Sequence, residues 1–286
     1  MTNQQRKLRL KDARERLKHA KKQHERLTEA FGKWNQTGGI QLIGRRHPEF
    51  CLFQYNVHVT QDPEENLSIL AGDVVHNLRV CLDYIATAIY TAGGGDIQSD
   101  QIKAVQFPIV RDEQQWAKTV AHNVPFAWDE AIEKLQWCQP YVQFQPNTEV
   151  LPVIQGLGST DKHQNLILFA MAVMAINGIS PEFTGDLNMN MLIAHPAPAI
   201  EIGEPKMLGR VYLEHGDAGI QSPNFARWSE GIDFREPKPP EVVFGFRAND
   251  GSEVRYNDLP HLIAHVEQIL ELFAKLKIPA TTTPTP

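Results

Sequence analysis

Residues 71–90 combine an apolar helical pattern with side chains that can carry acid–base chemistry. The polar members of this stretch, AGDVVHNLRVCLDYIATAIY, are Asp73, His76, Asn77, Arg79 and Asp83. A histidine exchanges protons near neutral pH, and an arginine can stabilise negative charge that develops on a phosphate. Acid, base and cation are the groups that a metal-independent ribonuclease needs. We therefore take His76, Arg79 and Asp83 as candidate catalytic residues, with Asp73 and Asn77 in supporting positions.

A second polar cluster lies in STDKHQNL, residues 159–166. We expect a helix over residues 160–177, and Asp161 in its first turn would suit the helix dipole. Lys162 is unfavourable at that position, which indicates another role for it. His163 is a fourth candidate catalytic residue, with Asp161 and Lys162 supporting it. If this helix packs against the first cluster, the two sets of side chains converge.

Asp73, His76, Arg79 and Asp83 form one stripe when the stretch is projected as a helix, and the apolar residues lie opposite. No Lys or Glu occurs between Gly72 and Gly93, although these two types are common on solvated helix faces. The stripe should therefore face other protein or a pocket, where buried polar groups need partners. Three interpretations stay open: a buried structural network, a functional site and a solvated face.

The two clusters also carry a resemblance to known families. GDVVHNLRVCLDYIA, FPI (residues 107–109), QPY (residues 139–141) and STDKHQNL resemble a family of uncharacterised bacterial and phage proteins with the pattern GDxxHNLRxxLD followed by DKH. That resemblance spans roughly residues 45–175 and implies no established activity. A weaker one is to HEPN-type helical ribonucleases and toxins, in which an Arg is followed a few residues later by a His. Here Val80 follows Arg79, and Tyr84 lies where the His is expected.

The HEPN resemblance implies a metal-independent ribonuclease without a cofactor. On this hypothesis His76 or His163 acts as base or acid, and Arg79 neutralises the charge of the phosphorane. Asp83 would orient Arg79 or one of the histidines.

Two alternatives remain open beside the nuclease, so the sequence does not decide whether the protein is an enzyme. In the first, the protein is a non-catalytic structural or interaction protein. Its two clusters form a buried network, and its N-terminal helix assembles a homo-oligomer. In the second, Asp73, His76, Asp161 and His163 bind zinc or iron, for which they are acceptable ligands. Their spacing matches no established metal motif.

The elements that must position these residues define an α+β fold. Apolar residues recur every three or four positions in about four main helices, at residues 5–35, 64–92, 160–177 and 258–277. The first is a long amphipathic helix with a heptad seam that needs a partner, and the last helix could pack along it. Alternating patterns predict a hairpin over residues 40–60 and a small antiparallel β region over residues 183–247.

These elements suggest a division of the chain into an N-terminal basic helix and one larger α+β domain. We expect residues 1–36 to form the basic amphipathic helix and residues 37–278 to form the α+β domain. Residues 279–286 (PATTTPTP from residue 279) read as a disordered tail.

Charge is distributed unevenly along the chain, whose net charge is −6. Residues 1–33 contain eleven Lys and Arg against four Asp and Glu. This basic segment could bind RNA by releasing counterions, or it could fold back on the acidic remainder. No apolar run is long enough to span a membrane. The three cysteines form no CxxC pair, which favours a reducing, cytoplasmic location.

Overall fold

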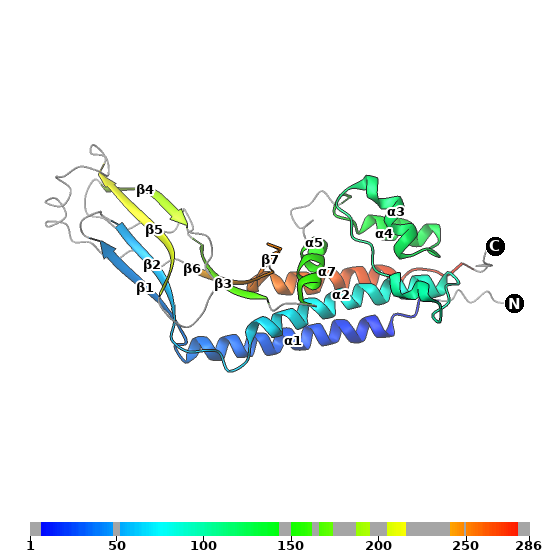
Figure 1. Cartoon of the computed structure of the whole chain (residues 1–286), viewed down its shortest axis with the longest axis horizontal. Helices are drawn as coiled ribbons and strands as arrows, with labels where there is room; N and C mark the ends of the chain where they lie inside the picture. The colour runs from blue at the N-terminus through cyan, green and yellow to red at the C-terminus, as the bar shows by residue number, and fades with distance from the viewer. Residues whose placement is uncertain are drawn as a thin grey trace.

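Three long helices lie side by side and form the body of the protein, as Figure 1 shows. They are α1 (Lys11–Gln36), α2 (Leu67–Ala92) and α7 (Leu259–Ala274). Antiparallel sheets extend from one end of this body. The computed structural model describes residues 7–47, 52–142, 150–161, 166–173, 187–194, 205–215, 241–248 and 250–279. The predicted α+β class, with a long N-terminal helix and a small antiparallel β region, is confirmed.

Helix α2 is the central helix of the body. It begins after Asn66, whose side chain caps the helix by accepting from the backbone N–H groups of Ser68 (3.0 Å) and Ile69 (3.2 Å). It ends at Gly93. Its apolar side is fully buried against α1 and α7. The helix predicted at residues 64–92 is confirmed, although it begins at Leu67.

Helix α1 packs its heptad seam against the rest of the chain. Its buried residues are Ala13, Leu17, Ala20, Leu27 and Trp34. Four exposed ion pairs border the seam: Arg14–Glu271 (4.0 Å), Lys21–Glu267 (2.7 Å), Arg26–Glu65 (2.6 Å) and Lys33–Glu64 (2.6 Å). The basic segment therefore folds back on acidic residues, and α7 lies along it as predicted.

The strands form two antiparallel sheets. The larger sheet has the order β1-β2-β5-β4, and the smaller has the order β3-β6-β7. The strands are β1 (Ile40–His47), β2 (Leu52–Val59), β3 (Ile167–Val173), β4 (Leu187–Ala194), β5 (Lys206–His215), β6 (Glu241–Arg247) and β7 (Glu253–Arg255). In the hairpin, Ile40 pairs with Val59. The predicted hairpin and the strands within residues 183–247 are confirmed.

The helix predicted at residues 160–177 is wrong. Helix α5 (Val150–Asp161) ends where that helix was expected to begin, and β3 occupies residues 167–173. The run LILFAMAVM is apolar throughout, and such a run fits a buried strand as well as a helix. Pro152 lies in the first turn of α5, where proline is tolerated. Gly156 is required there because a Cβ would collide with the Ser252 side chain.

Shorter helices complete the fold. They are η1 (Asp100–Ala104), η2 (Glu113–Gln115), α3 (Trp116–Asn123), α4 (Asp129–Trp137) and η3 (Tyr256–Asp258). Among the described helices, none is both long and apolar enough to cross a bilayer. The tail predicted to be disordered lies outside the described residues from position 280 onward.

The seam between α1 and α2 gives a first prediction. Leu27 is 0% exposed, so Leu27→Ala should lower the free energy of unfolding by about 2–5 kcal/mol through lost burial and a cavity. Urea denaturation measures this change. The control is Lys22→Ala on the exposed side of the same helix, which should shift stability by less than about 0.5 kcal/mol. Equal effects of the two variants would show that the seam contributes little.

Candidate functional site

The predicted stripe on α2 is half-buried along its length. Asp73, His76, Arg79 and Asp83 are all of intermediate exposure. The stripe is therefore neither a solvated face nor a closed core. The neighbours of each residue decide what it can do.

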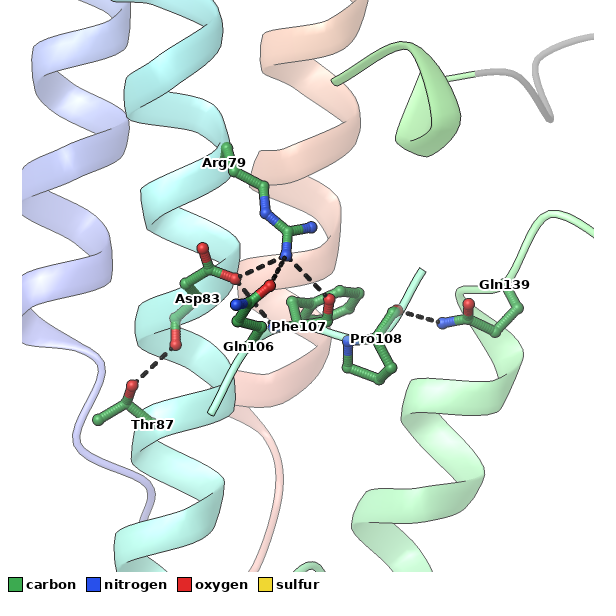
Figure 2. A network of polar contacts seen from close by, with 7 residues as sticks. All are labelled: Arg79, Asp83, Thr87, Gln106, Phe107, Pro108 and Gln139. Atoms are coloured by element: carbon green, nitrogen blue, oxygen red, sulfur yellow. Dashed lines mark hydrogen bonds and ion pairs between the residues drawn. The ribbon is translucent and has the colours of Figure 1, made fainter. Parts of the chain in front are cut away.

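Arg79 and Asp83 form an ion pair that binds the backbone of one residue, Phe107 (Figure 2). Nη2 of Arg79 lies 3.1 Å from Oδ1 of Asp83 and donates to the carbonyl oxygen of Phe107 at 3.3 Å. The same Nη2 lies 3.4 Å from Oε1 of Gln106. Oδ1 of Asp83 accepts from the backbone N–H of Phe107 at 2.9 Å. Both polar backbone groups of Phe107 are thus bound by one i,i+4 pair on α2.

Phe107 belongs to a segment, residues 105–110, that lies in no sheet and is buried except at Gln106. The other end of this segment is held by Gln139, which is 0% exposed. Its Oε1 accepts from the N–H of Val110 at 2.9 Å, and its Nε2 donates to the carbonyl of Pro108 at 3.0 Å (Figure 2). Buried backbone groups need partners, and here side chains of α2 and of Gln139 supply them.

Asn77 is turned toward α1. Its Nδ2 donates to the carbonyl of Asp73 at 2.7 Å, and its Oδ1 accepts from Nη1 of Arg16 at 3.4 Å. The Arg16 guanidinium also lies over the ring of Tyr84, 5.9 Å from its centroid. Asn77 therefore joins two helices and is separate from the Arg79–Asp83 pair.

His76 and Asp73 lie between these two sets of contacts. Within the described part of the chain, neither side chain makes a hydrogen bond or ion pair. The side chain of His76 is thus available for other contacts, whereas Arg79 and Asp83 are bound to the buried segment.

The second cluster is only partly described. Asp161 is the last residue of α5, so its expected position in the first turn of a helix is wrong. Its side chain, Lys162 and His163 lie outside the described residues. Gly158 does lie against the stem of Arg79, because a Cβ there would be 3.5 Å from Cβ of Arg79. The convergence of the two clusters remains a prediction.

Nη1 of Arg79 is a further feature of this region that the contacts above leave unexplained. It is buried and has no hydrogen-bond partner among the described residues. A buried guanidinium nitrogen without a partner is costly.

Metal and thiol chemistry find little support in the described chain. Among its residues, no three or more His, Cys, Asp or Glu side chains are grouped so that they could hold a metal ion. The ligand set of Asp73, His76, Asp161 and His163 includes undescribed side chains and remains a prediction. Burial raises the pKa of Cys81 to about 12 and that of Cys138 to about 12, so neither thiol is a nucleophile near neutral pH.

Comparison with known proteins adds no family to this description. No family model, curated protein or solved structure matches the chain. Function is therefore inferred from the geometry of these residues.

The sequence reasoning missed the polar side chains that hold the buried segment together with α2. Gln106 and Gln139 were not candidate residues. A signal was present, because FPI and QPY are two of the short motifs that carry the family resemblance. Each contains a proline, which cannot donate a backbone hydrogen bond.

Gln139 gives a second prediction. Gln139→Leu removes the partners of the Val110 N–H and the Pro108 carbonyl while keeping a buried side chain of similar size. Each unsatisfied buried group costs about 1–3 kcal/mol, so the free energy of unfolding should fall by about 3 kcal/mol in urea denaturation. Gln114→Leu, at an exposed position, is the control. If the Gln139 variant is as stable as this control, the hydrogen bonds of Gln139 to Val110 and Pro108 do not stabilise the fold.

His265 gives a third prediction. Burial lowers the pKa of His265 below its ordinary value of 6.5, and the neighbouring His261 lowers it further. The folded state therefore favours neutral His265, and unfolding takes up a proton once the pH falls below 6.5. This group leaves stability unchanged above that pH and reduces it as the pH falls toward the lowered pKa.

The test compares urea denaturation near pH 7.5 and pH 5.5 (about one unit on either side of an unperturbed histidine). His265→Gln should lose less stability than the parent protein between these conditions. His122→Gln, at an exposed position, serves as control. If the free energy of unfolding of His265→Gln falls as much between the two pH values as that of the parent, the burial of neutral His265 does not contribute to the loss of stability in acid.

Proposed function

We propose that the protein is a non-catalytic interaction protein in which the HNLR stretch of α2 has a structural role. One observation carries this proposal. Arg79 and Asp83 bind both polar backbone groups of the same residue, Phe107. The pair thereby fixes the buried segment on the helical body.

The coordination of Arg79 supports a structural role over a catalytic one. A catalytic arginine needs N–H groups directed at the place where charge develops. Nη2 of Arg79 is instead surrounded by three oxygens of its own chain, and its side chain is only 14% exposed. Oδ1 of Asp83 is bound to Arg79 and accepts from the backbone N–H of Phe107, so this oxygen is engaged within the chain.

The packing of α1 narrows the kinds of interaction that this protein can make. The apolar seam of α1 is buried against α2 and α7 of the same chain. Assembly of a homo-oligomer through that seam would require α1 to leave its own body. Partners should therefore bind to exposed surfaces of the folded chain.

Arg79 provides the test of this proposal. Arg79→Ala leaves Asp83 and the Phe107 carbonyl without their cation, so the free energy of unfolding should fall by about 2 kcal/mol. The parent protein should leave a labelled RNA intact on a denaturing gel. Lys118→Ala, at an exposed position on α3, is the stability control. If Arg79→Ala keeps its stability but abolishes cleavage seen with the parent protein, the structural role is excluded.

A metal-independent ribonuclease is the second candidate, and the unpaired Nη1 of Arg79 favours it. This nitrogen lies on the helix that also carries His76, and Gly158 of α5 packs on the same arginine. In this alternative His76 and His163 transfer protons, and Nη1 binds the phosphate. His76→Ala should then abolish RNA cleavage without changing the melting temperature. An RNA that stays intact with the parent protein removes this candidate.

A further inference from the structure

The exposed cations on and near α1 lie in two kinds of environment. The four cations that border the α1 seam are paired with carboxylates. On the outer side of α1, Lys18 and Lys22 alternate with Glu15 and Glu25. The basic character of this part of the helix is therefore largely cancelled.

At the start of α1 the situation is different. Figure 1 shows that α1 begins and α7 ends at the same end of the helical body, and Lys7 pairs with Lys277 in an antiparallel bridge. We call the five exposed cations gathered here the basic pole: Lys7, Arg9, Lys11, Lys275 and Lys277. None of them forms an ion pair within the described residues.

A groove of about 790 Å³ opens beside the basic pole, between α1, α2 and the segment after α7. Lys7 and Arg9 line it together with one carboxylate, Asp12. On the α2 side it is lined by the half-buried Tyr84 and by small residues, including Thr87 and Thr91. The groove thus combines cations, an aromatic ring and hydroxyl groups.

The polar groups on the α2 side of the groove can accept hydrogen bonds. The hydroxyl of Thr87 donates to the Asp83 carbonyl at 3.0 Å, and that of Thr91 donates to the Thr87 carbonyl at 2.8 Å. Their oxygens keep lone pairs that can accept from an amino group. Arg16 beside the ring of Tyr84 adds a further positive charge.

We propose that the basic pole and its groove bind single-stranded nucleic acid without sequence preference. Cations that follow a phosphate backbone, next to an aromatic ring on which a base can stack, are the two components of such sites. The hollow shape favours a strand with unpaired bases over a flat anionic membrane. This inference extends the proposed function, since it names the partner of a protein that binds without cleaving.

Two double charge reversals distinguish binding at the basic pole from non-specific attraction by the charge of the whole protein. Lys7→Glu with Arg9→Glu should weaken binding of a fluorescent oligouridylate of about twelve nucleotides by tenfold or more in fluorescence polarisation. Lys18→Glu with Lys22→Glu has the same net charge and should weaken it by less than about twofold. The parent protein should lose affinity with salt, and the Lys7/Arg9 double variant should show a slope smaller by about 1.4, the value for two lost phosphate contacts. Thermal melts establish that both variants fold.

Several outcomes would overturn the inference. Equal losses in the two double variants would show non-specific attraction, and an absence of binding at low salt would remove the site. Binding to vesicles that contain anionic lipid, without binding to the oligonucleotide, would assign the pole to membranes. A 2′-deoxy probe cannot be cleaved through its 2′ position, so it measures binding even if the RNA is degraded. Cleavage of RNA with retained binding of the deoxy probe would reject the proposed function and keep this inference.

Discussion

The packing of α2 between α1 and α7 is the constraint on which the rest of the structure depends. Its apolar side is fully buried, which sets the sides of the helix on which its polar residues lie. Arg79 and Asp83 consequently point at the buried segment, and Asn77 points at α1. Because buried polar groups must be paired, the polar side chains of α2 also bind residues 105–110, which pack against it.

Sequence periodicity predicted the three long helices because each has one strongly apolar side. It also placed Arg79 and Asp83 as i,i+4 neighbours on one helix, the spacing at which the two side chains pair. It could not supply their main partner, the backbone of Phe107, which follows Asp83 by twenty-four residues and belongs to no regular element. Contacts of this kind leave no periodic trace in a sequence.

The error at residues 160–177 has a similar origin. Helix α5 includes Pro152 and Gly156, because a helix tolerates proline in its first turn and glycine leaves room for the Ser252 side chain. The apolar run that follows had no period to distinguish strand from helix. Tertiary packing decided both assignments, and it also moved Asp161 from the beginning of a helix to the end of one.

The distribution of charge could also be predicted only in part from the sequence. The sequence showed a basic N-terminal segment, but a sum of charges does not separate paired cations from free ones. The structure makes that separation, because α7 and residues 64–65 neutralise part of α1 while the C-terminal lysines add to its beginning. Helix α2 borders both the groove beside the basic pole and the Arg79–Asp83 pair. Thr87, which lines the groove, donates to the carbonyl of Asp83. A partner at the basic pole would therefore contact the same helix that carries the Arg79–Asp83 pair.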